Sequence, residues 1–260
     1  MALRASRADA VVIVKGDQLG DDFWTALEGR PHVLWLYDEL RRTRWKTRSM
    51  TIVGPICSYS RLDAEALMGL GLPARHLPLA FDHQLRPHPP SRRMSETVFI
   101  GARYPERQRT LEALADGGIP VRAFGRDWSH HPWDRLRTWD LRRPTLPAGR
   151  DLDRGDAYDT MTAARATLNI HGDQDGFTMR TFEACGAGAL QLIDRSDLQG
   201  LYDDGSELAS YSSDAEMIDL CHRAAVDIRW SERVRTAARA RTMAEHTFDH
   251  RVKVLEESWG

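Results

Sequence analysis

A proline-rich stretch divides the chain into two parts. Residues 86–93 read Arg-Pro-His-Pro-Pro-Ser-Arg-Arg, with three prolines in four positions. Proline fixes the backbone angle φ and has no amide hydrogen to donate, so this run is excluded from helix interiors and central strands. We therefore expect residues 87–96 to link a domain at 1–86 to a second domain at 97–244. A last helix at 245–260 can cross back to the first domain.

Short apolar strands alternate with helices on both sides of this linker. The strands are expected at 10–15, 32–37, 50–54 and 75–80, and then at 97–100, 121–124, 167–171, 189–194 and 208–211. Apolar strands that alternate with helices are typical of a parallel sheet covered on both faces. The pattern predicts an α/β fold with two Rossmann-like, doubly wound parallel-sheet domains, of which the first is short or incomplete.

The helices follow from apolar residues at helical spacing. They are expected at 21–28, 60–68, 106–116, 157–166 and 179–185, and from 214 almost to the end. Residues 128–150 are expected to form a loop-rich insertion. The basic run at 41–46 is interpreted as a solvated loop, with contact to an anionic acceptor or nucleic acid as the alternative.

Composition narrows the class of protein. The chain has 260 residues, of which 42% are hydrophobic and 28% charged, as in an ordinary globular protein. The net charge of −2 argues against a nucleic-acid partner. No apolar run approaches the roughly 18–20 residues of a membrane helix, and no signal peptide is evident. Three scattered cysteines suit a reducing cytosol, so we expect a cytoplasmic protein with no integral membrane segment. The many arginines are typical of a high-GC bacterial gene.

The densest chemical signal lies at residues 169–188. They read Asn-Ile-His-Gly-Asp-Gln-Asp-Gly-Phe-Thr-Met-Arg-Thr-Phe-Glu-Ala-Cys-Gly-Ala-Gly, a strand that ends in a small polar loop before a helix begins near Phe177. Free backbone N–H groups at a helix start bind anions, and Gly176 lets the backbone approach a phosphate closely. The segment is thus a candidate phosphate site.

Carboxylates flank this candidate site. Glu183 lies about two turns into the helix, on a face that it can share with Arg180, and it can accept two hydrogen bonds from a ribose diol. A plain strand–loop–helix unit, with Asp173 and Asp175 as solvated caps, explains the same residues equally well.

A family resemblance favours the functional interpretation. The spacing Asp175-x7-Glu183, followed by Ala-Cys-Gly-Ala-Gly-Ala, resembles the acidic signature of retaining GT-B glycosyltransferases of the group 1 superfamily. Residues 97–252 are similar, more narrowly, to CgeB-like (spore-maturation type) glycosyltransferases. The matching segments are Val98–Gly101 with Tyr104 and Arg107, Phe124–Trp128, Leu168–Ile170 and Ala244–Arg251. The first half matches more weakly, through Val14–Gly16, Trp35–Asp38 and Leu77–Ala80.

The resemblance implies an activity and a set of site residues. It implies transfer of a sugar from a nucleotide-sugar donor to a small-molecule or glycan acceptor, with retention of configuration and without a metal or other cofactor. The implied catalytic residues are Asp175 and Glu183, and His171 is a further catalytic candidate because it follows a strand and can face the cleft. The implied donor-binding residues are Gly101, Arg103, Arg107, Gly125, Trp128, Gly176, Phe177, Thr178, Arg180 and Glu183. Asp151 and Asp153 have the spacing of an Asp-x-Asp metal motif, which we interpret as coincidence.

Two departures from the family pattern leave alternatives open. Asp175 stands where many group 1 enzymes have glutamate, so a shorter side chain must reach the sugar. The first domain also lacks a strand–helix–strand portion that family members usually carry. The alternative is therefore a non-catalytic or partner-dependent nucleotide-sugar-binding subunit, acting as a homo-oligomer or with a partner subunit. An epimerase or phosphorylase of the same fold is a third possibility.

Overall fold

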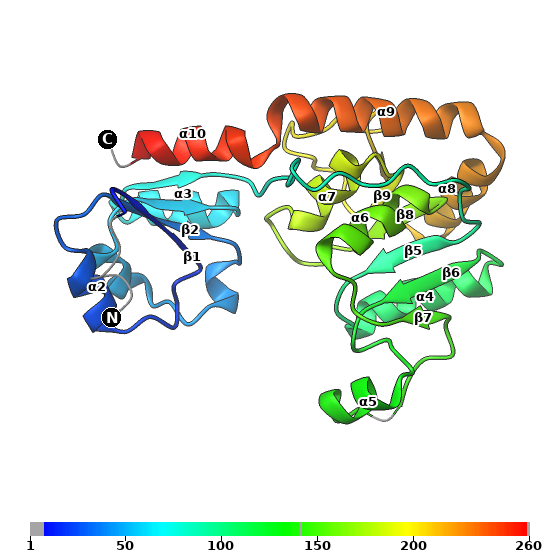
Figure 1. Ribbon diagram of the computed structural model, residues 1–260, viewed down its shortest axis with the longest axis horizontal. Coiled ribbons are helices and arrows are strands. Elements are labelled where there is room, and N and C mark those ends of the chain that lie inside the picture. Colours follow the sequence, from blue (N-terminus) through cyan, green and yellow to red (C-terminus); the bar gives the residue numbers. More distant parts are fainter. Residues whose placement is uncertain (1–7, 141, 259–260) are drawn as a thin grey trace. The chain divides into compact units, whose positions relative to one another are not determined.

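The computed structural model describes residues 8–140 and 142–258, and the chain divides into two compact units (Figure 1). The first unit comprises residues up to Ala80, Asp173–Met179 and residues from His246 on, and the second comprises Phe81–Gly172 and Arg180–Glu245. The chain therefore leaves the second unit for seven residues, at the polar loop that the sequence singled out, and enters it again at Arg180.

The first unit is built on a four-stranded parallel sheet. Its strands are β1 (Val11–Val14), β2 (His32–Leu36), β3 (Ile56–Ser58) and β4 (Ala74–His76), in the order β1-β2-β3-β4. Its helices are α2 (Asp21–Leu27), α3 (Arg61–Gly69) and α10 (Phe248–Ser258), with 3₁₀ turns at Leu40–Arg42 and Thr47–Ile52. The side chains of Leu34, Leu36 and Ile56 are fully buried in its core.

The strand predicted at 50–54 is wrong. Residues Thr47–Ile52 form a 3₁₀ turn, and the third strand begins later, at Ile56. Gly54 has φ +71, a left-handed conformation that an extended strand does not allow. Met50 and Val53 of this run are nevertheless core residues, whereas Ile52 is exposed.

The last helix belongs to the first unit. The Arg251 Nε atom donates to the backbone oxygens of Pro78 at 2.8 Å and of Leu79 at 3.2 Å, just beyond β4. The ring of Phe248 packs edge-on against that of Trp35 on β2. These contacts dock α10 against the end of the small sheet.

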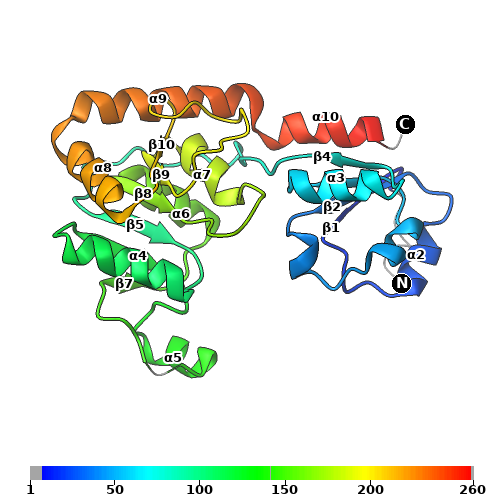
Figure 2. The same ribbon diagram turned by 180° about the vertical axis from the view of Figure 1, so that it is seen from behind.

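The second unit is built on a six-stranded parallel sheet. Its strands are β5 (Thr97–Ile100), β6 (Val121–Phe124), β7 (Ala148–Gly149), β8 (Ala166–Asn169), β9 (Gln191–Ile193) and β10 (Ala209–Ser210), in the order β10-β9-β8-β5-β6-β7. Its helices are α4 (Pro105–Asp116), α5 (Pro132–Thr138), α6 (Arg154–Ala163), α7 (Met179–Ala187), α8 (Asp214–Val226) and α9 (Ile228–Glu245). Figure 2 shows the same elements from behind.

The strand order creates a switch point beside β5. From β5 the chain builds outward to β6 and β7, and then returns to the other side of β5 to form β8. Because parallel crossovers are right-handed, connections that run in opposite directions place their helices on opposite faces of the sheet. Ligands of such sheets bind outside the carboxyl ends of the strands, near the reversal.

The insertion at 128–150 is more regular than the sequence predicts. It contains α5 and the edge strand β7, whose residues Ala148 and Gly149 pair with Ala123 and Phe124. A two-residue strand carries too few side chains to produce an alternating pattern, so sequence periodicity does not detect it.

Helix α7 is enclosed by the second unit. Every side chain from Thr181 to Ala187 is buried. The small residues near its end are required by packing, since a Cβ atom on Gly186 would lie 2.3 Å from the buried ring of Phe81. This burial fixes the position of the side chains at the start of α7. Among the residues described, no helix is both long and apolar enough to cross a membrane.

Candidate functional site

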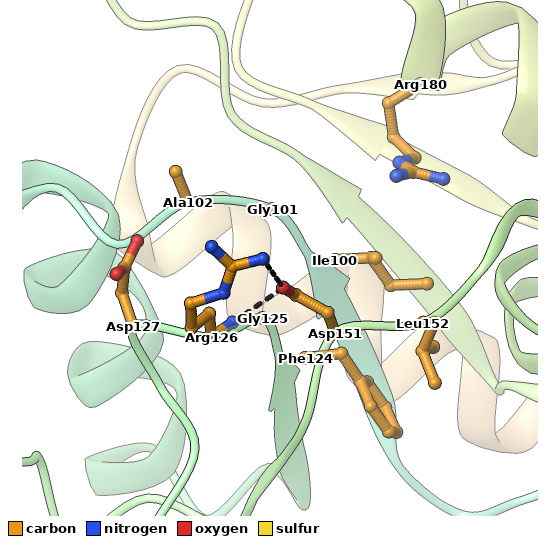
Figure 3. Close-up of a pocket in the computed structure, with 10 residues that line it drawn as sticks. All are labelled: Ile100, Gly101, Ala102, Phe124, Gly125, Arg126, Asp127, Asp151, Leu152 and Arg180. Atoms are coloured by element: carbon orange, nitrogen blue, oxygen red, sulfur yellow. Dashed lines mark hydrogen bonds and ion pairs between the residues drawn. The ribbon is translucent and has the colours of Figure 1, made fainter. Parts of the chain in front are cut away.

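A pocket opens at the carboxyl ends of β5, β6 and β7 (Figure 3). Its volume is about 270 Å³, close to the lower end of ligand pockets, roughly 300–1,000 Å³. The residues that line it are Ile100, Gly101, Ala102, Phe124, Gly125, Arg126, Asp127, Asp151, Leu152 and Arg180. All belong to the second unit, and three of them, Gly101, Gly125 and Arg180, are among the predicted donor-binding residues.

Two glycines bring adjacent strand ends close together. Gly125 has φ +149, and a Cβ atom there would lie 2.7 Å from the backbone oxygen of Gly101. Any larger residue would therefore push the turn after β6 away from the turn after β5. The pocket is lined with backbone here because side chains do not fit.

Trp128 stabilises the turn that follows β5. Its side chain is fully buried, and its Nε1 atom donates to the backbone oxygen of Gly101 at 2.9 Å. Its ring meets that of Phe99 edge-on. Trp128 does not line the pocket but holds Gly101 in place, and its predicted role in donor binding stays a prediction.

A charged pair absent from the predicted site lies within the pocket. Asp151, just after β7, accepts from the Arg126 backbone N–H at 2.7 Å and pairs with the Arg126 Nη2 atom at 2.9 Å. Figure 3 shows the two side chains joined, with Arg180 apart from them on the side of α7. The pocket thus presents both donors and acceptors to a polar ligand.

The two aspartates of the Asp-x-Asp spacing have separate roles. Asp151 lines the pocket, whereas the Asp153 side chain accepts from the Asp156 backbone N–H and caps α6. Within residues 8–140 and 142–258, no three histidine, cysteine, aspartate or glutamate side chains are grouped as metal ligands would be.

Glu183 is a buried carboxylate held between two arginines. It is 5% exposed, and its oxygens lie 2.7 Å from Arg180 Nη1 and 3.6 Å from Arg154 Nε. Arg154 is in turn 3.5 Å from Asp82. A buried carboxylate requires compensating charge, which the two arginines supply, and their contacts restrict its orientation. Arg180 joins this cluster to the pocket, which it lines.

The two other predicted arginines are engaged elsewhere in the second unit. Arg103 pairs with Asp140 and lies 3.2 Å from the Gln108 side-chain oxygen. Arg107 donates to the backbone oxygen of Ile170 at 2.9 Å, and its guanidinium lies over the ring of Tyr104. Arg107 therefore ties the start of α4 to the end of β8, and neither arginine lines the pocket.

His171 lies in the interior of the second unit. Its backbone N–H donates to Asp194, its Nδ1 atom is 3.4 Å from the same carboxylate, and its Nε2 atom is 3.3 Å from the Thr181 hydroxyl. Burial lowers the pKa of the imidazole, an effect that Asp194 opposes. The side chain joins the ends of β8 and β9, and this geometry gives no support to a direct contact with substrate.

The first half of the acidic motif is held by the first unit. The Asp175 carboxylate accepts from the Ser60 hydroxyl at 2.7 Å and from the Leu62 backbone N–H at 3.0 Å, so it caps the start of α3. The Asp175 backbone N–H donates to Glu39 at 2.6 Å. The capping of α3 by Asp175 and the hydrogen bond from Asp175 to Glu39 both lie within the first unit.

Neighbouring residues of the loop are fixed in the same unit. Asp173 accepts from Arg41 and Arg42, and the hydrogen bond from Arg41 lowers the pKa of the Asp173 carboxyl. A Cβ atom on Gly176 would lie 2.4 Å from the Tyr59 ring. Phe177 is buried and Thr178 is half-buried. The structure therefore divides the predicted site, with Asp175, Gly176, Phe177 and Thr178 in the first unit and Arg180 and Glu183 in the second.

Sequence reasoning missed several of these residues. Arg126 lies in the matching segment Phe124–Trp128 without a predicted role, Arg154 belongs to no motif, and only the fold brings them to Asp151 and Glu183. The 41–46 run, interpreted as a solvated loop, supplies both arginines that hold Asp173. Its dense positive charge was the one signal that could have indicated an acidic partner.

The protein-family model described as "Glycosyl transferase-like" matches residues 103–257, more than half of the chain, so the chain belongs to this glycosyltransferase family. No curated protein sequence matches it.

Solved structures share the fold at low sequence identity. HepE from Anabaena, in complex with UDP and glucose, has a TM-score of 0.66 at 13% identity, over 90% of this chain and 74% of that one. Sucrose-phosphate synthase from Thermosynechococcus elongatus has a TM-score of 0.67 at 12% identity, over 98% and 74%. The β-glucosyltransferase of T4 phage has a TM-score of 0.59 at 13% identity, over 99% and 83%. The fold is GT-B, as the sequence predicted, with two parallel-sheet α/β domains.

Proposed function

We propose that this chain is a glycosyltransferase that binds a nucleotide-sugar donor in the pocket of the second unit and transfers the sugar to an acceptor. The observation that carries the proposal is Glu183. Its buried carboxylate is oriented by Arg154 and by Arg180, which lines the pocket at the strand ends, and a carboxylate is suited to accept hydrogen bonds from a ribose diol. The UDP complexes of HepE make UDP-sugars the first donors to test.

The pocket offers partners for the other parts of a nucleotide. Backbone groups of Gly101 and Gly125 line one side, where a planar base can approach without meeting a side chain. Arg180 lines the other side and is the cation nearest to the diphosphate in this assignment. Backbone N–H groups at the start of α7 would add to its positive potential.

The chemistry we assign is displacement at the anomeric carbon. The bond between this carbon and the donor diphosphate breaks, and a bond to an acceptor oxygen forms as that oxygen loses its proton. Negative charge develops on the departing diphosphate, and Arg180 with the α7 N–H groups would stabilise it without a metal. We further propose retention of configuration, which proton NMR of the product anomer would test, while EDTA would test independence of metal.

A thermal-shift experiment tests donor binding. The intact chain is heated with UDP, GDP, dTDP and the corresponding sugar nucleotides, and a ligand at 100 times its dissociation constant should add about 2.7 kcal/mol of stability. Glu183→Gln should lose this effect. Glu65→Gln, which alters an exposed glutamate on α3, is the matched control. Absence of a shift with every nucleotide would contradict the donor-site assignment.

A second candidate function is a nucleotide-sugar-binding subunit without its own transferase activity. The observation in its favour is that the Asp175 carboxylate, predicted to contact the sugar, caps α3 through Ser60 and Leu62. Donor binding without release of nucleotide, in the presence of a broad set of glycan and small-molecule acceptors, would favour this candidate. Release of nucleotide together with a glycosylated product would exclude it.

A further inference from the structure

Helix α5 is folded with its polar side inward. Asp134 is 3% exposed, and its carboxylate accepts two hydrogen bonds from Arg150, from Nε at 2.8 Å and from Nη2 at 3.1 Å. In contrast, Trp133 is 56% exposed and Leu136 is 52% exposed. This is the reverse of an ordinary surface helix, which buries its apolar face. In Figure 1, α5 lies on a long loop, away from the other helices of the second unit.

A second tryptophan extends the apolar surface. Trp139 follows α5 directly, is 87% exposed, and has φ +53, a left-handed conformation that residues other than glycine seldom adopt. Spacing of three residues places Trp133 and Leu136 on one face of the helix. Clustered large apolar side chains in solvent mark a surface that binds something else.

Positive charge accompanies these side chains. Arg137 and Arg142 are exposed, and neither guanidinium has an ion-pair partner within residues 8–140 and 142–258. The nearby carboxylates are already paired, Asp134 with Arg150 and Asp140 with Arg103. The surface is therefore apolar and cationic at once. We call Trp133, Leu136, Arg137, Trp139 and Arg142 the α5 patch.

We propose that the α5 patch docks on a lipid bilayer surface that carries anionic headgroups. Tryptophan is enriched at the membrane–water interface, where its ring lies among the headgroups. Arginine pairs with lipid phosphate while its alkyl stem remains in apolar surroundings. Three apolar side chains are too few for a stable protein interface of about 800 Å² per partner, whereas a bilayer requires no preformed complementary surface. The inference does not depend on donor binding.

Sedimentation with vesicles tests the proposal. The full chain is mixed with phosphatidylcholine vesicles, with and without phosphatidylglycerol, and the bound fraction is measured at low and high salt. One double variant, Trp133→Ser with Trp139→Ser, removes the aromatic side chains of the α5 patch. A second double variant, Arg137→Gln with Arg142→Gln, removes its positive charge. Val226→Ser with Ile228→Ser removes another exposed apolar pair of the same unit and serves as the matched control.

The proposal predicts binding to the anionic vesicles and at least about tenfold weaker partition for each α5 variant, because each arginine near an anionic surface and each inserted tryptophan adds to affinity. The control pair should bind like the unaltered chain, and circular dichroism should show all variants folded. Equal binding to neutral vesicles, or unchanged binding of the tryptophan variant, overturns the proposal. Two other results would also overturn the proposal if the chain does not bind vesicles. One is a dimer that the tryptophan variant abolishes, and the other is retention on heparin that the same variant abolishes.

Discussion

Arg180 and Glu183 form an ion pair of 2.7 Å across one turn of α7, and it links the candidate pocket to the buried carboxylate. Arg180 lines the pocket with 26% of its side chain exposed, whereas the side chain of Glu183 is almost fully enclosed. A ligand in the pocket would therefore meet the arginine directly, and this arginine is paired with a carboxylate that does not itself line the pocket.

Replacing Arg180 should weaken donor binding. Arg180→Gln removes a pocket cation and one of the two guanidinium groups that hold Glu183, so we expect the dissociation constant of the best nucleotide to rise about tenfold or more. Isothermal titration calorimetry measures this directly. Arg229→Gln, at an exposed arginine of α9, should leave the constant unchanged. Equal affinities for both variants would remove Arg180 from the donor site.

Arg154 should act on the donor through Glu183 alone. Its Nε atom lies 3.6 Å from this carboxylate, and it does not line the pocket. Arg154→Gln should therefore weaken nucleotide binding less than Arg180→Gln, and the loss should nearly vanish in a Glu183→Gln background. Full additivity of the two changes in a double-mutant cycle would contradict this positioning role.

Gly176 should be sensitive to the smallest enlargement. In Gly176→Ala the new Cβ would lie 2.4 Å from Tyr59, whose ring is buried, and we expect a loss of about 1–3 kcal/mol in the free energy of unfolding. Gly155→Ala provides a control of opposite sign, because Gly155 lies within α6 with room for a methyl group, and alanine there should stabilise by about 0.5–1 kcal/mol. Urea unfolding of both variants measures these changes in the free energy of unfolding.

The sequence was informative where one pattern determines one structure. The mostly apolar segment 97–100 and the segment 121–124, in which Arg122 interrupts the apolar residues, were predicted as parallel strands at the observed residues. The run at 50–54 misled because its apolar residues also suit a 3₁₀ turn that buries Met50, and the left-handed conformation of Gly54 distinguishes this turn from a strand. Hydrophobicity reports burial more reliably than the local backbone conformation that achieves it.

The candidate site was less predictable because its contacts span long distances in sequence. The pairing of Arg154 with Glu183 joins two helices separated by strand β8, and the cap of α3 by Asp175 joins residues more than a hundred positions apart. Motif spacing predicts a functional role for Glu183, but it does not reveal that Asp175 contacts Ser60. His171 illustrates the same limit, since a histidine at a strand end can face a pocket or the core, and here Asp194 and Thr181 hold it inside.

Asp175→Asn separates capping from catalysis. The neutral amide oxygen still accepts from Ser60 and Leu62 but loses the favourable interaction of a charge with the α3 N-terminus, so we expect a loss of about 0.5–1 kcal/mol in stability. If Asp175 also contacts the sugar, transferase activity should fall far more than the small stability change accounts for. Ser60→Ala, which removes the other capping group of α3, should lower stability by about 1 kcal/mol with little change in activity.

Protonation of His171 should limit stability in mild acid. Burial lowers the pKa of His171 in the folded chain below its ordinary value of about 6.5, so the unfolded chain takes up the proton first. The free energy of unfolding is then unaffected above this value and declines as pH falls below it toward the folded pKa. The slope approaches about 1.4 kcal/mol per pH unit for one histidine.

Burial also lowers the pKa of His76, which adds to the decline of stability in the same pH range. His171→Gln should therefore reduce, without abolishing, the dependence of stability on pH between about 6.5 and 5. Thermal unfolding of both proteins across this range measures the difference, and parallel curves would show that His171 does not titrate on unfolding.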